Sequence, residues 1–195
     1  MYKGTYDIII VGGGHAGCEA AAAAARLGVN TALFTHKIET IGEMSCNPAI
    51  GGLGKGHLVR EIDALDGVMG QAIDRGGIQF RMLNESRGAA VRGPRAQADR
   101  VLYKKAILEA VKNQQNLDII EGSVNDIIIK NRKVAGIELS GGQNISCESV
   151  VLTTGTFLRG MIRVGDKSIQ AGRVGDKPSV SLAKKIEKLK FSIGR

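Results

Sequence analysis

The stretch that decides the fold spans residues 7–17 and reads Asp7-Ile8-Ile9-Ile10-Val11-Gly12-Gly13-Gly14-His15-Ala16-Gly17. Its apolar half predicts a buried parallel strand, and the alanine-rich segment 18–27 predicts the helix that follows the glycines. In a strand-turn-helix unit, Gly12 makes the turn, Gly14 admits a pyrophosphate and Gly17 lets the helix pack closely on the strand. The unpaired N–H groups at the helix start would face the phosphates. The stretch therefore predicts a dinucleotide-binding site, with a purely structural glycine turn as the alternative.

The sugar side of this site is less regular. The second strand is expected at residues 31–35, and in dinucleotide-binding folds it usually ends with an acidic residue that binds the ribose. Here the strand ends in Thr35-His36, and the nearest acid, Glu39, falls on the following loop. Thr35 or His36 could hydrogen-bond the ribose, and a solvated loop end is an equally good interpretation.

The composition is that of a globular protein. Of its 195 residues 43% are hydrophobic, which is enough for one full domain with a buried core. The sequence has no run of about 18 apolar residues, the length needed to span a bilayer. The N-terminus enters the first strand too soon for a signal peptide. We therefore expect a cytoplasmic protein without a membrane segment. Three cysteines, with no C-x-x-C pair, indicate neither a disulfide framework nor a metal site.

The net charge of +8 is concentrated between residues 75 and 105. Two acidic residues, Glu85 and Asp99, stand in this window against eight basic ones: Arg75, Arg81, Arg87, Arg92, Arg95, Arg100, Lys104 and Lys105. A local excess of this kind suits a polyanion, either cofactor phosphates or a nucleic-acid backbone, and a solvated basic face is the alternative. With four Phe, three Tyr and no Trp, the sequence shows no stacking platform of the kind that single-strand binders use.

The remaining patterns complete an α/β chain. Further helices are predicted at 58–72, 103–111 and 182–189. Strands are predicted at 78–82, 117–121, 124–129, 134–139 and 150–154, and a small hairpin at 162–175. Segments 38–56 and 84–97 read as loops. The strand at 150–154 ends in Thr154-Gly155-Thr156, whose glycine would let the backbone approach the same cofactor from the other side.

Several strings together carry a family resemblance: GGGHAG at 12–17, TIGEMSCNPAIGG at 40–52, GKGHLV at 54–59, RAQADR at 95–100 and TTGTFL at 153–158. Over essentially its whole length the chain closely resembles the MnmG (GidA) family of tRNA uridine 5-carboxymethylaminomethyl modification enzymes. The strings SCNPAIGG and RAQADR are far more selective than the glycine fingerprint.

The resemblance implies a Rossmann-like FAD/NAD(P)-binding domain of the glutathione-reductase type, with a parallel central sheet that is incomplete at the C-terminus. It implies FAD as cofactor, NADH as reductant, and a homodimer that joins the GTPase MnmE in a heterotetramer. Together they add the carboxymethylaminomethyl group at C5 of the wobble uridine of certain tRNAs, with a folate one-carbon donor. Carried onto matching positions, the FAD contacts are Gly12, Gly13, Gly14, His15, Ala16 and Gly17 at the pyrophosphate, Val124 at the adenine end, and Ser179.

Cys46 matches a family cysteine near the flavin that has an assigned catalytic role. A thiol there could act as nucleophile or proton donor, and a nearby cation such as Lys55 or Arg60 could favour its thiolate. A free cysteine is also often a small buried hydrophobe, which is the alternative for Cys46. Cys18 and Cys147 are interpreted as structural, and His15 as a residue that shapes the pyrophosphate turn.

Part of the tRNA contact is expected in the basic window. We assign it to four arginines, which would bind phosphates without reading the base sequence: Arg87, Arg92, Arg95 and Arg100. No metal ligand is expected.

Full-length members of the family are several hundred residues long, so the resemblance implies an N-terminal fragment. We expect one FAD-binding domain over residues 1–195, with a small inserted region at about 157–178, that is competent only when the missing part is supplied. A truncated, non-catalytic remnant is one alternative. Another is the related folate- and FAD-dependent tRNA uracil methyltransferase, against which the SCNPAIGG string argues. The resemblance does not decide whether this chain alone is an enzyme.

Overall fold

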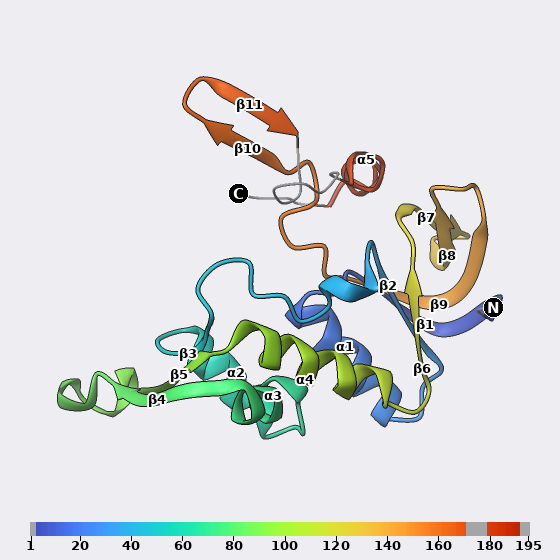
Figure 1. The fold of residues 1–195 in the computed structure, drawn as a ribbon. Coiled ribbons are helices and arrows are strands. Elements are labelled where there is room, and N and C mark those ends of the chain that lie inside the picture. Colours follow the sequence, from blue (N-terminus) through green and yellow to red (C-terminus); the bar gives the residue numbers. More distant parts are fainter. Residues whose placement is uncertain (1–2, 171–178, 192–195) are drawn as a thin grey trace.

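A six-stranded sheet forms the centre of the molecule, and the computed structural model describes residues 3–170 and 179–191 (Figure 1). The strand order of the sheet is β6-β2-β1-β9-β8-β7. Its first four strands run parallel: β6 (Leu117–Glu121), β2 (Thr31–Thr35), β1 (Thr5–Val11) and most of β9 (Asn144–Leu152). The expected α/β fold with a mostly parallel central sheet is confirmed.

The other end of the sheet is an antiparallel hairpin of β7 (Val124–Lys130) and β8 (Lys133–Leu139). Asn131 and Arg132 connect the two strands with positive φ angles of 50° and 64°, the backbone of a tight two-residue hairpin turn. Strand β9 joins the two halves, because residues 144–146 pair antiparallel with β8 and residues 146–152 pair parallel with β1. The sheet that we expected to be parallel is therefore mixed at this end.

Both faces of the parallel strands are covered, which explains why their sequences are almost continuously apolar. One face packs against three helices, which lie together to the lower left of the sheet in Figure 1: α1 (His15–Arg26), α3 (Val68–Gly76) and α4 (Arg100–Lys112). The opposite face packs against the β7–β8 hairpin and α5 (Val180–Lys188). The predicted helices at 103–111 and 182–189 are thus confirmed as α4 and α5.

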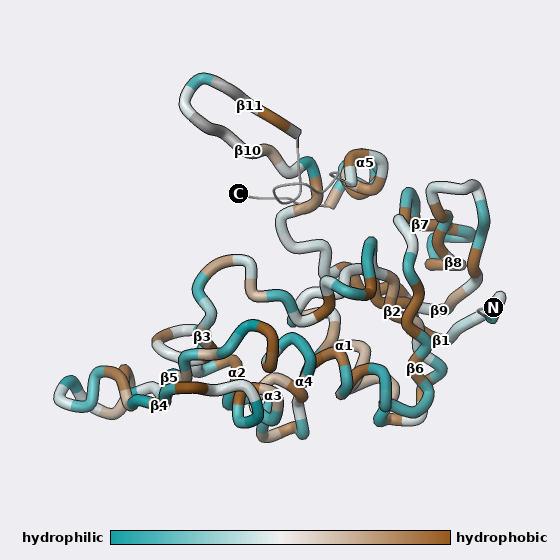
Figure 2. Tube along the Cα trace, viewed as in Figure 1, coloured by the Kyte–Doolittle hydropathy of each residue, from teal (hydrophilic) through white to brown (hydrophobic). Residues whose placement is uncertain are grey.

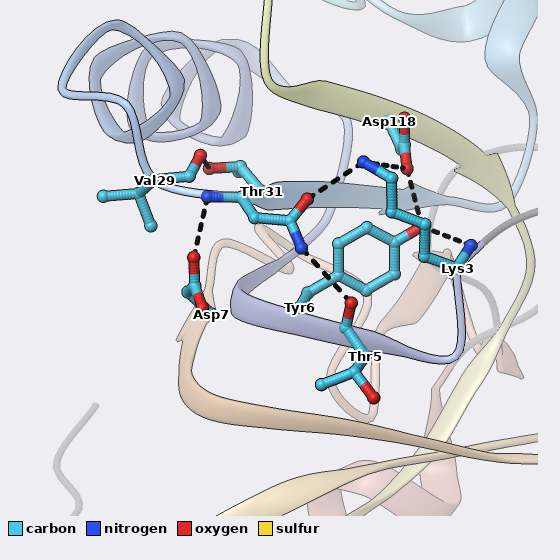
Figure 3. Close-up of polar contacts among 8 residues, drawn as sticks. Lys3, Thr5, Tyr6, Asp7, Val29, Thr31 and Asp118 are labelled. Atoms are coloured by element: carbon cyan, nitrogen blue, oxygen red, sulfur yellow. Dashed lines mark hydrogen bonds and ion pairs between the residues drawn. The ribbon is translucent and has the colours of Figure 1, made fainter.

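Polar contacts hold the amino ends of the parallel strands together (Figure 3). The Tyr6 hydroxyl donates a hydrogen bond to Asp118 Oδ2 at 2.9 Å, which ties β1 to β6 across β2. The Asn30 N–H donates to Asp7 Oδ2 at 2.9 Å, and Lys3 Nζ donates to Asn30 Oδ1 at 3.1 Å. These contacts fix the strand register at one end of the sheet and leave the carboxyl ends free to shape a binding site.

The prediction of one helix over residues 58–72 is wrong. The chain forms α2 (Lys55–Asp63) and then α3, separated by a short turn. Asp66 has a φ of 64°, a left-handed conformation that ends a helix, and a Cβ at Gly67 would lie 2.7 Å from the Ile62 carbonyl oxygen. Leu58 and Leu65 of the predicted apolar stripe are exposed, and α2 and α3 instead reach the common core through Val59, Ile62, Val68 and Met69.

A second sheet is antiparallel and has the order β3-β5-β4, with β3 (Ala49–Gly51), β5 (Gly93–Ala98) and β4 (Gly77–Leu83). The strand predicted at 78–82 is confirmed as β4, but the segments 38–56 and 84–97, expected as loops, each contain a strand. Strand β3 is very short and β5 carries Pro94 and Arg95, so neither shows apolar alternation. Strand β4 is an edge strand without a fully buried residue, although Figure 2 shows apolar residues along it.

A hairpin of β10 (Met161–Val164) and β11 (Lys167–Gln170) lies beyond the carboxyl ends of the parallel strands, at the top of Figure 1. It confirms the hairpin expected at 162–175 within the described part of that segment. The expected inserted region at about 157–178 includes residues 171–178, which lie outside the described residues.

Candidate dinucleotide-binding site

A cavity of about 250 Å³ lies at the carboxyl ends of the parallel strands, the position where open α/β sheets bind ligands. Segments far apart in the sequence line it: the glycine turn after β1, the end of β2, the start of β7, the segment after β9, and Ser179 before α5. The predicted cofactor contacts that meet here are Gly12, Gly13, Gly14, Val124 and Ser179. His15, Ala16 and Gly17 stand at the start of α1 and are not part of the lining.

The three glycines of the fingerprint differ in their surroundings. Gly12 has a φ of +117°, and a Cβ on it would lie 2.5 Å from the Thr153 carbonyl oxygen. A Cβ on Gly17 would lie 1.8 Å from the Gly12 carbonyl oxygen, so the helix contacts the turn directly. A Cβ on Gly14 would meet nothing within 4 Å. Gly12 and Gly17 are therefore required by close packing, whereas Gly14 keeps space open beside the cavity.

The N-terminus of α1 is available to an anion. Gly14 is its N-cap, no side chain caps the first turn, and this turn carries no acidic residue. The first N–H groups of a helix lack intrahelical partners and carry the positive end of the helix dipole. The His15 ring packs against the Tyr103 ring with 5.6 Å between centroids, which places His15 between the turn and α4. This end of α1 has the chemistry of a phosphate-binding site.

Thr153 joins the end of β9 to the glycine turn, a role that we did not assign from the sequence. Its Oγ1 lies 3.0 Å from both the Val11 and the Gly12 carbonyl oxygens, and its N–H donates to the Val11 carbonyl at 2.9 Å. The following residues, Thr154 to Phe157, line the cavity. The prediction that the Gly155 segment approaches the site from the other side agrees with this placement. Thr153 is the first residue of the TTGTFL string at 153–158, but no local sequence pattern predicts the hydrogen bonds of its hydroxyl group.

Thr35 and His36 line the sugar side of the cavity, as the sequence placed them. Thr35 is buried and its hydroxyl donates to the Lys37 carbonyl at 3.4 Å, while the exposed His36 ring packs edge-on against Phe157 at 5.5 Å. Glu121 at the end of β6 accepts a hydrogen bond from the Ile38 N–H at 3.0 Å. Among the described residues no carboxylate lines the cavity, so a hydroxyl and an imidazole occupy the usual acidic position.

Cys46 lies on the exposed loop before β3, which overturns its alternative interpretation as a buried hydrophobe. The neighbouring Ser45 lines the cavity, whereas Cys46 does not. The Arg100 Nη2 donates to the Cys46 carbonyl oxygen at 2.6 Å and so holds the backbone of this loop. Of the two cations proposed near the thiol, Lys55 instead donates to the Ala49 carbonyl at 3.1 Å, and Arg60 lines a different cavity.

The other two cysteines are buried, as their structural interpretation expected. The Cys18 Sγ lies 3.7 Å from the Gly13 carbonyl oxygen, beneath the glycine turn. Burial, reinforced by the nearby Glu19 carboxylate, raises the pKa of Cys18 to about 12. Burial likewise raises the pKa of Cys147 to about 11. Both thiols are therefore protonated at neutral pH, and neither lines the cavity.

The four arginines assigned to tRNA contact are spread along one arm of the molecule, from the tip between β4 and β5 to the start of α4. Arg92 Nε donates to the Glu85 carbonyl at 2.8 Å, and Arg100 holds Cys46, so both have a structural partner. Within residues 3–170 and 179–191, the guanidinium groups of Arg87 and Arg95 make no hydrogen bond or ion pair with another residue.

Glu19 links α1 to α3, another contact that the sequence did not reveal. Its two carboxylate oxygens accept hydrogen bonds from the first N–H groups of α3, Val68 at 3.0 Å and Met69 at 2.7 Å. The carboxylate thus replaces the N-cap side chain that α3 lacks, since Gly67 occupies its N-cap position. No sequence signal connects residues so far apart in the chain.

The described ranges hold neither a membrane-spanning helix nor a metal-binding cluster. No helix there is long and apolar enough to cross a membrane. In the same part of the chain, no group of three or more His, Cys, Asp or Glu side chains could hold a metal ion.

The sequence and the fold both have known relatives. Residues 7–195 match the family described as Glucose inhibited division protein A (GIDA). The tRNA uridine 5-carboxymethylaminomethyl modification enzyme MnmG of Granulibacter bethesdensis is 62% identical over 193 residues, covering 97% of this chain and 31% of that protein. The crystal structure of Aquifex aeolicus GidA (form II) has a TM-score of 0.91 at 49% identity, covering 97% of this chain and 32% of that one.

A more distant structure, that of the GidA-related protein from Thermus thermophilus, shares the fold alone, with a TM-score of 0.65 at 18% identity. The match covers 97% of this chain and 71% of the Thermus thermophilus chain. This chain spans about a third of the length of the two similar proteins above. The family match begins at Asp7, the first residue of the fingerprint stretch, and includes every segment that lines the cavity. Sequence and fold together show that the chain belongs to the GidA family.

Proposed function

We propose that this chain is the FAD-binding part of a tRNA-modifying flavoenzyme that works with the GTPase MnmE. Such an enzyme adds the carboxymethylaminomethyl group at C5 of the wobble uridine of certain tRNAs. One observation carries the proposal: at the carboxyl ends of the parallel strands, an uncapped helix N-terminus and an open glycine adjoin one cavity. The name of the 62% identical relative, a tRNA uridine modification enzyme, supports the choice of substrate.

The residues around the cavity fit FAD. A pyrophosphate is an anion, and the first turn of α1 offers it N–H groups that no side chain caps and no acidic residue of that turn repels. Gly14 leaves open the space that a side chain would fill between this backbone and the phosphates. Val124 and Ser179 line the same cavity, and we assign them to the adenine end of FAD and to a further contact with it.

When bound, FAD would supply the electron-transfer chemistry, with NADH as the proposed reductant. The residues of this chain bind and orient it. Thr153 keeps the glycine turn against β9, and Thr35 and His36 offer a hydroxyl and an imidazole where related folds offer the ribose a carboxylate. Because neither a hydroxyl nor an imidazole is an anion here, these groups add no negative charge beside the phosphates.

Cys46 is the residue that we propose for a catalytic role, as nucleophile or proton donor. Its thiol is exposed, the adjacent Ser45 lines the dinucleotide cavity, and the Arg100 hydrogen bond to its carbonyl limits the movement of the loop. The other two cysteines are buried and protonated at neutral pH, so they are poor nucleophiles.

For the RNA, we propose contacts from Arg87, Arg92, Arg95 and Arg100 to phosphates. The local excess of basic residues between 75 and 105 supports this assignment. We further propose a homodimer that joins MnmE in a heterotetramer, a cytoplasmic location, and a single FAD-binding domain over residues 1–195 with an insertion at about 157–178.

The visible absorption spectrum of the purified protein, recorded with and without added FAD, tests the proposed function. Flavin bands that remain with the protein through gel filtration are the expected result. A protein that is folded by circular dichroism yet stays colourless in excess FAD would contradict the proposal. It would instead favour the non-catalytic remnant.

A further inference from the structure

The segment that carries Cys46 lies between two cavities, and we term residues 45–49 the cysteine loop. At its start, Ser45 lines the dinucleotide cavity. Just after its end, Ile50 and Gly51 line a second cavity of about 390 Å³, which lies between the small antiparallel sheet and the helices α2 and α3. The charged residues that line this second cavity are Arg60, Asp63, Asp74, Arg81 and Arg95. The conformation of the cysteine loop therefore decides where its thiol stands relative to the dinucleotide cavity.

Four consecutive carbonyl groups of this loop, those of residues 46–49, all accept a hydrogen bond. Backbone groups bind the two inner ones. The Ala49 N–H donates to the Asn47 carbonyl at 2.8 Å. The Ala98 N–H donates to the Pro48 carbonyl at 2.7 Å. Most of the loop is exposed, so water could solvate these carbonyl groups. A complete set of protein donors instead indicates a backbone that is held in one conformation.

Cationic side chains bind the two outer carbonyl groups of the run. Arg100 Nη2 donates to the Cys46 carbonyl at 2.6 Å, and Lys55 Nζ donates to the Ala49 carbonyl at 3.1 Å. Within residues 3–170 and 179–191, neither cation forms an ion pair with a carboxylate. Hydrogen bonds from a charged donor are roughly twice as strong as those between neutral groups. The cysteine loop is thus held at both ends, from two different helices.

Both cations stand where helix stability disfavours them. Arg100 is the first residue of α4, and Lys55 is the first residue of α2. The positive end of the helix dipole repels a cation in the first turn. The Asp99 side chain caps α4 by accepting the first free N–H groups, so the helix start that carries Arg100 is itself fixed. Contact with the cysteine loop, rather than stabilisation of either helix, accounts for a cation at these two positions.

We propose that Arg100 and Lys55 are positioning residues for Cys46, which hold the cysteine loop so that the thiol stays beside the dinucleotide cavity. The inference rests on the proposed function, in which Cys46 is a nucleophile or proton donor. Both side chains act through the backbone of the loop and not on the reacting atoms. A fixed loop keeps the approach geometry that a reacting thiol requires. Arg100 has further N–H groups, so this role is compatible with the phosphate contact proposed above.

The mobility of a nitroxide label on Cys46, measured by electron paramagnetic resonance, tests the proposal. The other two cysteines, Cys18 and Cys147, are buried, so the native protein should be labelled at Cys46, and Cys46→Ser serves as the blank. We expect a slowly moving label in the parent. Arg100→Met and Lys55→Met each keep an unbranched apolar stem but lose the donor. Each should shorten the correlation time of the label about threefold or more.

Two controls remove positive charge without touching the cysteine loop. Lys105→Met lies on α4, where the lysine pairs with Glu109 of the same helix at 3.8 Å. Arg81→Ala/Arg95→Ala removes two cross-strand partners that line the second cavity. Both controls should keep the parental spectrum. Arg100→Lys, which retains a charged donor, should restore most of the slowly moving component, a rescue that lost packing alone would not explain.

Alkylation of Cys46 by iodoacetamide, followed by mass spectrometry, separates positioning from a purely structural role. Saturating FAD should slow the reaction about fivefold in the parent, because the ligand would lie beside Ser45, but only about twofold or less in Arg100→Met and Lys55→Met. The FAD affinity of these variants, measured by quenching of flavin fluorescence, should match that of the parent, since neither side chain lines the dinucleotide cavity. A purely structural role would lower the stability and the FAD affinity together.

Circular dichroism and urea unfolding verify that each variant folds, and the Arg100 and Lys55 variants test the proposal independently. It is overturned if the label moves no faster in them than in Lys105→Met, or if FAD slows alkylation equally in all folded variants. A folded parent that binds no FAD would contradict the proposed FAD site. The mobility of the label would then still decide whether the two cations hold the cysteine loop.

Discussion

The dinucleotide cavity and the second cavity differ in what builds their walls. The first is built around a glycine turn, the end of a strand in which every residue is buried, and an uncapped helix end, and no carboxylate of the described residues lines it. Five charged residues line the second, and its edge strand β4 has no fully buried residue. The first site therefore depends on close approach of a ligand to the glycine backbone, and the second on the charges of a few exposed side chains.

The largest effect that would test this contrast is expected for Gly17→Ala. Its Cβ would lie 1.8 Å from the Gly12 carbonyl oxygen, so the helix must move away from the turn. We expect a loss of about 3 kcal/mol in the free energy of unfolding, measured by urea denaturation. Gly14→Ala is the matched control, because its Cβ meets nothing within 4 Å and its φ of −77° suits alanine. Equal stability of the two variants would contradict the packing role of Gly17.

A smaller effect is expected for Glu19→Gln, which weakens the link between the two regions. Each carboxylate oxygen accepts one N–H at the start of α3, whereas an amide keeps a single acceptor oxygen and turns its NH2 group toward the other N–H. We expect a loss of about 2 kcal/mol, together with faster hydrogen exchange in α3, the helix beneath the second cavity. The exposed Glu61 on α2 supplies the control variant, Glu61→Gln, which should leave both unchanged. Unaltered exchange in α3 would rule out the link.

The smallest effect concerns pH and the thiol under the glycine turn. Because burial raises the pKa of Cys18 from 9.0 to about 12, the unfolded chain loses this proton at a lower pH than the folded chain. The stability from the buried thiol is therefore complete below pH 9 and falls by about 1.4 kcal/mol for each pH unit above it, until the folded pKa is reached.

Urea unfolding at pH 8.5 and pH 10 measures this slope, and Cys18→Ala is the variant to compare. Cys147, whose pKa burial raises to about 11, contributes to the slope in both proteins, so Cys18→Ala should reduce the slope without abolishing it. An identical slope in the two proteins would show that Cys18 ionises as readily in the folded chain as in the unfolded one.

The same contrast explains which elements of the fold could be predicted from the sequence. The strand, turn and helix at residues 7–26 were predictable because all their signals are contiguous, and the glycine roles follow from backbone geometry. The strands β3 and β5 were not predictable from the sequence, because pairing between distant segments holds them and β5 carries Pro94 and Arg95. The break before α3 was hidden because the apolar period continues through Asp66 and Gly67.

Individual side-chain contacts were the least predictable part of the site. Thr153 and Glu19 act through hydrogen bonds to residues far away in the sequence, and such pairs leave no local pattern. Arg100 was assigned to RNA from charge alone, yet its guanidinium donates to the Cys46 carbonyl. Charge in a window indicates a class of ligand, whereas the hydrogen-bond partners of each arginine decide which guanidinium groups are available to it.

The most direct measurement of the central claim is a titration of FAD, followed by quenching of flavin fluorescence, with the parent protein, Gly14→Val and Arg81→Ala/Arg95→Ala. We expect saturable binding by the parent and parental affinity in the arginine variant. Folded Gly14→Val should bind at least tenfold more weakly, because its side chain fills the space kept open by Gly14. A folded parent that never saturates, or a Gly14→Val protein that binds FAD as tightly as the parent, would contradict it.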